Sequence, residues 1–167
     1  MNYSIIFSSH TGNTELIAER IKTIMHGELV YYGEPTDIIP DCDLICIGFW
    51  TNRGTCNEEI LDYLQKLNNK KIFLFGTAGF GVDNKYFNDI IKNVSDNINN
   101  SNTIVDTFMC QGKMPLSVRE KYVRLKESSN PPDNIDLLIE NYDNALLHPT
   151  ADDLVELTSK ILALKEI

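Results

Sequence analysis

Short apolar runs that alternate with amphipathic stretches constrain the fold of this chain more than any other feature. Five runs have the length of buried strands, at residues 3–7, 29–32, 44–49, 71–75 and 104–109. The segments with apolar residues at helical spacing are 14–25, 58–67, 86–98 and 151–164. This alternation is typical of β/α units around a parallel sheet. We therefore expect an α/β fold with a doubly wound, five-stranded parallel sheet.

One segment interrupts the alternation. Residues 111–147 lie between the fifth predicted strand and the last predicted helix, and they are too many for an ordinary β/α connection. They contain the sequence Ser-Ser-Asn-Pro-Pro, which favours a turn between helical pieces. We expect an insertion within a single domain that spans residues 1–167.

The charge and the cysteines exclude several classes of function. The chain has 24 acidic and 15 basic residues and a net charge of -9, which disfavours nucleic acid and anionic membranes as partners. No stretch reaches the ~18 apolar residues of a membrane span, and the N-terminus does not resemble a signal peptide. The four cysteines form no C-x-x-C pair, so we expect no metal site and reduced thiols in the cytoplasm. The acidic surface suits a protein that docks on a basic partner, although solubility alone explains the same composition.

The loop after the first strand has the composition of a phosphate site. In an open parallel sheet, ligands bind beyond the carboxyl ends of the strands. Here a helix begins at once, and its N-terminus presents unpaired N–H groups to an anion. The loop offers hydroxyls, an amide and a glycine but no Lys or Arg, in the order Ser9, His10, Thr11, Gly12, Asn13 and Thr14. Neutral donors favour the phosphate of a mononucleotide, whereas a helix cap without a ligand is the alternative.

This hexapeptide resembles the T/S-x-T-G-N-T signature of the flavodoxin family, and it follows the first strand as the signature does in that family. The resemblance covers nearly the whole chain and implies the strand order 2-1-3-4-5. It also implies FMN as the cofactor, with its phosphate in the first loop. The flavin ring would lie between the loops that follow strands three and four. An electron-transfer flavoprotein of this kind needs no catalytic acid or base, and we predict none.

The resemblance assigns the residues of the two ring loops. Trp50, directly after the third strand, is expected to stack on the ring, although a core aromatic residue is the alternative. After it come Thr51, Asn52, Arg53, Gly54 and Thr55. The Gly54 peptide is expected to meet the flavin N5 and to change orientation on reduction, and Arg53 either lies near the flavin N1 or is solvated. The other loop contains Thr77, Ala78, Gly79, Phe80 and Gly81, with backbone N–H groups for the pyrimidine edge.

A narrower resemblance is carried by Gly48-Phe49-Trp50-Thr51, by Gly54-Thr55-Cys56, by residues 108–115, and by His148-Pro149 leading into Asp152-Asp153-Leu154. This resemblance is to a subgroup of atypical flavodoxins, the BilS-type proteins, which accompany bilirubin reductases. It implies an electron supply for the reduction of bilirubin to urobilinogen, and a redox partner that docks near the flavin edge. The insertion is where a specific partner contact is expected.

Two other functions stay open at the level of sequence. An NAD(P)H-dependent flavin oxidoreductase, such as a quinone or tetrapyrrole reductase, needs an open face over the flavin. A non-redox binding module on the same fold is the third hypothesis. Cys56 and Cys110 lie near the predicted site, and we expect them to be small apolar fillers rather than reactive thiols.

Overall fold

The fold is known from a computed structural model, which describes residues 1–81 and 83–164. Its sheet contains five parallel strands: β1 (Asn2–Phe7), β2 (Glu28–Gly33), β3 (Leu44–Asn52), β5 (Lys71–Ala78) and β6 (Thr103–Gln111). Their order is β2-β1-β3-β5-β6, and the short β4 (Thr55–Cys56) pairs antiparallel with the end of β3. The predicted fold class and strand order are therefore confirmed, because β4 is only a two-residue extension of one strand.

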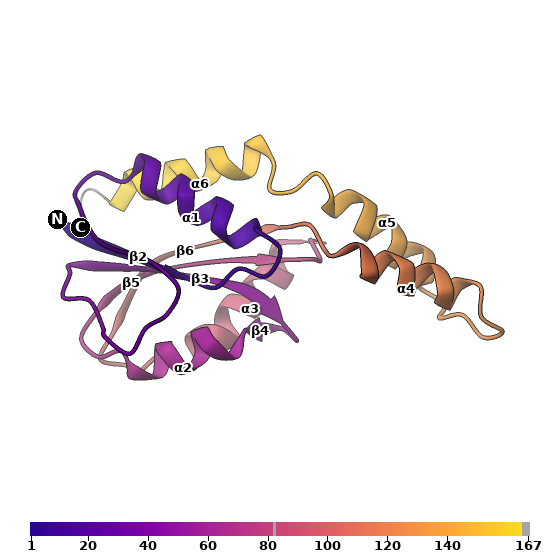
Figure 1. The fold of residues 1–167 in the computed structure, drawn as a ribbon, viewed down its shortest axis with the longest axis horizontal. Coiled ribbons are helices and arrows are strands. Elements are labelled where there is room, and N and C mark those ends of the chain that lie inside the picture. Colours follow the sequence, from indigo (N-terminus) through magenta and orange to yellow (C-terminus); the bar gives the residue numbers. More distant parts are fainter. Residues whose placement is uncertain (82, 165–167) are drawn as a thin grey trace.

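The continuous apolar runs are explained by burial on both faces of the sheet. On one face, Cys46 and Phe75 belong to a core that includes residues of α1 (Asn13–Ile24) and α6 (Ala151–Ala163). On the other face, Ile47 and Leu74 pack with residues of α2 (Glu58–Lys66) and α3 (Asn84–Ser95). Figure 1 shows these two helical layers on opposite sides of the sheet. Strands covered in this way need no polar face.

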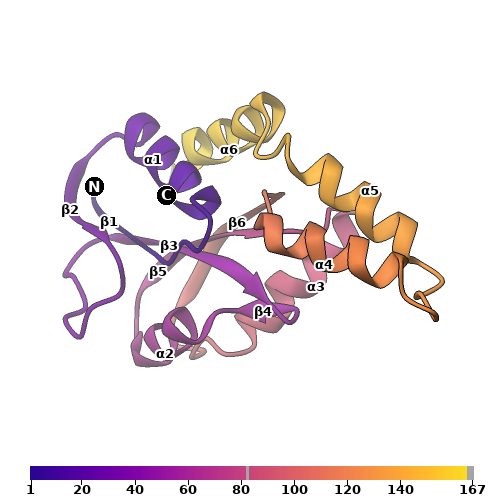
Figure 2. The same cartoon turned by 45° about the vertical axis from the view of Figure 1, so that its right-hand side comes forward.

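The insertion forms two helices, α4 (Leu116–Lys126) and α5 (Ile135–Ala145), between β6 and α6. They lie side by side and project beyond the end of the sheet that is far from the labelled chain ends (Figures 1 and 2). No residue of α4 is buried. Arg119 pairs with Asp143 at 2.8 Å and Lys126 with Asp136 at 2.7 Å, which joins the basic helix to the acidic one.

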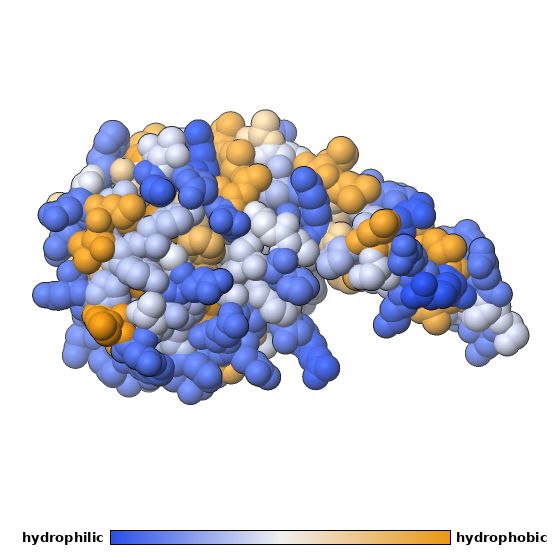
Figure 3. Space-filling view, viewed as in Figure 1, coloured by the Kyte–Doolittle hydropathy of each residue, from blue (hydrophilic) through white to orange (hydrophobic). Residues whose placement is uncertain are grey.

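The surface is mostly hydrophilic, with hydrophobic residues both over the main body and on the projecting helices (Figure 3). Leu137 and Leu147 of the insertion are 63% and 74% exposed. Among the helices that the structure describes, none is long and apolar enough to cross a membrane.

Candidate functional site

The loop between β1 and α1 has backbone N–H groups without an acceptor among the described residues. Gly12 precedes the helix with a φ of 84°, and a Cβ at this position would meet nothing within 4 Å. Within residues 1–81 and 83–164, no acceptor is hydrogen-bonded to the N–H groups of the four residues from Thr11 to Thr14. Four such donors at a helix N-terminus, where the helix dipole is positive, form a site for an anion.

The polar side chains of this loop contact the protein. The Asn13 amide Nδ2 donates to Thr11 Oγ1 at 2.7 Å and to the Lys113 carbonyl at 2.8 Å. The Thr14 hydroxyl, in a residue that is 1% exposed, lies 3.3 Å from the Phe49 carbonyl and 3.1 Å from Thr77 Oγ1. The donors left for an anion are therefore mainly the backbone N–H groups rather than these side chains.

Ser9, His10 and Trp50 meet at a polar cavity. Ser9 Oγ accepts a hydrogen bond from the Glu15 N–H at 3.3 Å, and the ring centroids of His10 and Trp50 are 5.3 Å apart. Trp50 is half-buried at the end of β3. The cavity holds about 480 Å³ and is lined by Ser8, Ser9, His10, Glu34, Trp50, Asn52, Asn57, Glu58 and Glu59. Its three glutamates make it unsuitable for a phosphate, whereas the loop N–H groups suit one.

The residues after Trp50 form a tight hairpin that the sequence analysis did not predict. Thr51 pairs with Cys56 and Asn52 with Thr55, so that Arg53 and Gly54 are the two turn residues. Their φ values are 51° and 80°, as in a type I′ turn. Arg53 is exposed at the tip, and the Gly54 carbonyl accepts a hydrogen bond from Asn93 Nδ2 of α3 at 2.9 Å. A change in the orientation of this carbonyl therefore breaks a bond to α3.

Polar oxygens without partners gather beside this hairpin. Among the described residues, five buried side-chain oxygens lack a hydrogen-bond partner, and Thr51 Oγ1, Thr55 Oγ1 and Asn57 Oδ1 are three of them. Asn57 is 3% exposed and lines the same cavity as Trp50. Buried polar groups are nearly always satisfied, so this cluster indicates an environment that a polar ligand completes.

The third predicted loop lies against the insertion. Thr77 and Ala78 are buried at the end of β5, and Trp50 is aligned with Thr77 in the sheet. Gly79, Phe80 and Gly81 follow, and the Gly79 carbonyl accepts hydrogen bonds from the side chains of Gln111 and Asn141. No contact between the rings of Trp50 and Phe80 is present in the described part of the chain.

The cysteines near the site are buried thiols. Cys56 and Cys110 are 3% and 2% exposed, and all four cysteines are free. Burial raises the pKa of both thiols above the ordinary value, so neither is a thiolate at neutral pH. Within the described residues no His, Cys, Asp and Glu cluster could hold a metal ion.

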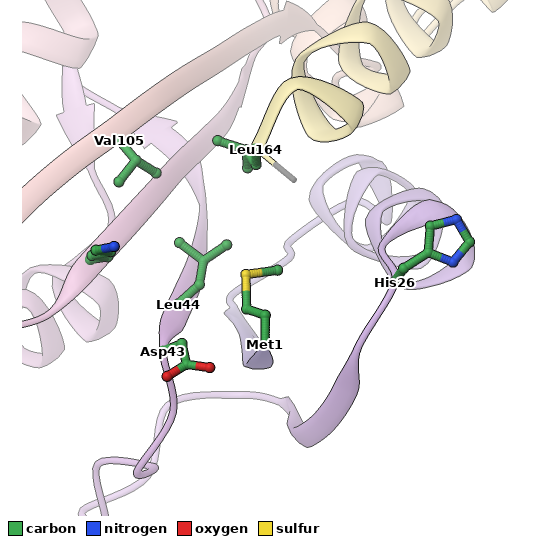
Figure 4. A pocket seen from close by; sticks show the side chains of 7 residues that line it. Met1, His26, Asp43, Leu44, Val105 and Leu164 are labelled. Carbon is green, nitrogen blue, oxygen red and sulfur yellow. The ribbon is translucent and has the colours of Figure 1, made fainter. Parts of the chain in front are cut away.

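A second cavity lies at the opposite end of the sheet, where the strands begin. It holds about 370 Å³ and is lined by residues at the amino ends of β1, β3 and β5, including Met1, Leu44 and Lys71 (Figure 4). Ligands of open α/β sheets bind at the carboxyl ends of the strands, so this cavity is not the candidate site.

Several residues of the site lay outside the sequence predictions. Glu34 follows β2 and Asn57 precedes α2, so both lie at the carboxyl ends of the strands, where the site is expected. Lys113 and Asn141 belong to the insertion. The pattern of apolar residues does not predict that the insertion contacts the loops of the site.

Comparison with known proteins extends these observations. A family model described as "Flavodoxin domain" matches residues 4–161. Two curated proteins named "Flavodoxin-like domain-containing protein BilS" are similar to the chain. The one from Clostridium symbiosum (strain WAL-14163) is 34% identical, and the alignment covers 92% of this chain and 90% of that protein. The one from Clostridioides difficile (strain CD3) is 31% identical, and the alignment covers 93% of this chain and 92% of that protein.

The fold has solved counterparts. The crystal structure of oxidised Flavodoxin 2 from Bacillus cereus superposes with a TM-score of 0.57 at 15% sequence identity, and the match covers 99% of each chain. A short-chain flavodoxin associated with a non-canonical PDU bacterial microcompartment gives a TM-score of 0.52, also at 15% identity, over 87% of this chain and 96% of that chain.

Proposed function

This chain belongs to the flavodoxin domain family, and on that premise we propose that it binds FMN and carries electrons between partner proteins. The observation that carries the proposal is the row of N–H groups without acceptors from Thr11 to Thr14, above the open Gly12. Such a row holds a phosphate by neutral donors and the helix dipole.

The residues around Trp50 fit the rest of the cofactor. The partnerless oxygens of Thr51 and Asn57 are acceptors for the hydroxyl and N–H donors of a ribityl flavin. Trp50 offers an aromatic face, and residues 77–81 supply backbone donors for the pyrimidine edge. When bound, FMN supplies the redox chemistry, and the protein binds and orients it. No side chain is needed as a general acid or base.

For the destination of the electrons, we propose the reduction of bilirubin to urobilinogen. The similarity to two proteins named BilS supports this assignment, together with the subgroup resemblance in the sequence. The net charge of -9 suits docking on a basic reductase near the flavin edge. We propose a cytoplasmic location, where four free cysteines stay reduced.

The test is a visible spectrum of the purified protein with FMN added, followed by anaerobic reduction. An electron carrier gives a bound-flavin spectrum that NAD(P)H alone leaves unchanged. It then passes electrons to a bilirubin reductase once it has been reduced chemically. Direct reduction by NAD(P)H supports the flavin oxidoreductase hypothesis instead. Absence of binding with excess FMN leaves the non-redox module, and failure to support bilirubin reduction overturns the proposed destination.

A further inference from the structure

At its base the insertion is bonded to two of the three predicted cofactor loops, the phosphate loop at residues 9–14 and the ring loop at residues 77–81. The Gly112 N–H donates to the Ala78 carbonyl of the ring loop at 2.9 Å. The next residue, Lys113, donates its N–H to Asn13 Oδ1 of the first loop at 3.2 Å. One short segment of the insertion therefore joins the two loops. The apolar core does not require this connection.

The Gly79 carbonyl receives two donors from this segment and from α5. Gln111 Nε2 lies 2.9 Å from the carbonyl oxygen, and Asn141 Nδ2 lies 3.1 Å from it. The two side chains are also bonded to each other, since Gln111 Nε2 lies 3.1 Å from Asn141 Oδ1. A carbonyl oxygen has two lone pairs, so two fixed donors determine its direction.

Close packing reinforces this arrangement. A Cβ on Gly79 would lie 2.5 Å from Met114 Cγ, and one on Gly81 would lie 2.5 Å from Gln111 Oε1. The close neighbour of these glycines is thus the insertion, whose Met114 and Gln111 side chains pack against this side of the loop.

The orientation of the Gly79 carbonyl fixes the direction of the Phe80 N–H in the same peptide unit. The only cis peptide among the described residues is His148–Pro149, so the Gly79–Phe80 peptide is trans. In a planar trans peptide the N–H points away from the C=O. The Phe80 N–H therefore points away from the insertion, and it has no acceptor within the described residues.

We propose that Asn141, together with Gln111, is a positioning residue for the flavin ring: it holds the Gly79–Phe80 peptide so that the Phe80 N–H donates to an acceptor on the pyrimidine edge. This inference rests on the proposed binding of FMN. It assigns the insertion a part in the cofactor site, in addition to the partner contact expected there.

The test compares Asn141→Asp with Asn144→Asp. The first substitution keeps the shape of the side chain but replaces its amide donor with a carboxylate oxygen, which repels the Gly79 carbonyl. Asn144 lies on the same helix, is exposed, and makes no side-chain hydrogen bond within the described residues, so its variant controls for the charge. We expect the Kd for FMN to rise about tenfold in Asn141→Asp and to stay unchanged in Asn144→Asp. The affinity for inorganic phosphate should stay unchanged in both, since a merely structural defect would weaken phosphate as well.

Hydrogen exchange on the protein without flavin gives an independent readout. We expect the amides of residues 79–81 to exchange several-fold faster in Asn141→Asp than in Asn144→Asp. Equal exchange in the two variants overturns the positioning role, whether or not FMN binds. Wild-type Kd values for FMN in Asn141→Asp overturn it while leaving the proposed function intact. Failure of the wild-type protein to bind FMN refutes the proposed function and, with it, the role towards the ring.

Discussion

The side chain of Asn13 and the backbone of Lys113 form a reciprocal pair of hydrogen bonds across 100 residues of sequence. Asn13 Nδ2 donates to the Lys113 carbonyl at 2.8 Å, and the Lys113 N–H donates to Asn13 Oδ1 at 3.2 Å. Asn13 is 8% exposed, so water does not readily replace either bond. The shape of the first loop therefore depends on the insertion.

The first prediction concerns this pair. Asn13→Ala leaves the Lys113 N–H without its acceptor and leaves the Lys113 carbonyl with only the Thr11 hydroxyl as a donor, and we expect the free energy of unfolding to fall by about 1–3 kcal/mol. Urea denaturation measures the change. Asn100→Ala, at an exposed loop position, is the control and should stay within about 0.5 kcal/mol of wild type. A wild-type value for Asn13→Ala would show that the pair contributes nothing.

The second prediction tests the anion site. Thr11 is exposed and lies among the free N–H groups, so a carboxylate at this position faces the FMN phosphate. We expect Thr11→Asp to raise the Kd for FMN at least about tenfold through charge repulsion. Thr11→Asn, which is neutral, is the matched control. Wild-type affinity in Thr11→Asp, measured by flavin fluorescence titration, means that the phosphate lies elsewhere.

The third prediction tests the aromatic face. Trp50→Ala should weaken FMN binding by about 1–3 kcal/mol, the scale of one lost stacking contact, and Trp50→Phe should lose less. Trp50 is the only tryptophan in the chain, so its fluorescence should be quenched when the flavin binds. Unquenched emission at saturating FMN, or an unchanged Kd in Trp50→Ala, removes Trp50 from the ring site.

The fourth prediction concerns alkaline pH. Burial raises the pKa of the Cys46 and Cys110 thiols above the ordinary value of 9.0. The unfolded chain ionises these thiols near pH 9, whereas the folded protein keeps them protonated. Stability is therefore complete below about pH 9 and is lost as the pH rises towards the folded-state pKa, by about 1.4 kcal/mol per pH unit for each thiol.

Urea denaturation at pH 8 and pH 10 measures this loss. Cys46→Ala should lower the stability at pH 8 because it leaves a cavity, but it should show a smaller drop between the two pH values than wild type. Equal drops in the two proteins would mean that the Cys46 thiol does not resist ionisation in the folded state.

The fold class could be predicted because it depends on a simple pattern, whereas the strand order was implied by the resemblance to the flavodoxin family. Runs such as residues 44–49 and 71–75 are apolar throughout because helices cover both faces of the sheet, and the runs alternate with helical periodicity. Period and length are local properties of a sequence. Period and length therefore indicated the class of fold, and they indicated that the loops meet at the carboxyl ends of the strands.

The details of the site could not be predicted in the same way. The pairing of Asn13 with Lys113 and the two donors on Gly79 are polar contacts between distant segments, and no periodicity encodes them. The Arg53–Gly54 turn had a local signal, a glycine at the second turn position, but the same glycine was assigned to the flavin. The roles of these residues towards FMN stay predictions.

The absence of buried residues in α4 has a consequence for kinetics. A helix whose side chains are at most partly buried opens at a lower free energy than the sheet, so we expect the insertion to open as a unit before the sheet does, starting from α4. The base of this unit is bonded to the phosphate loop and to the ring loop at residues 77–81. We therefore expect the residence time of the cofactor to follow the opening rate of the insertion rather than the unfolding rate of the whole protein.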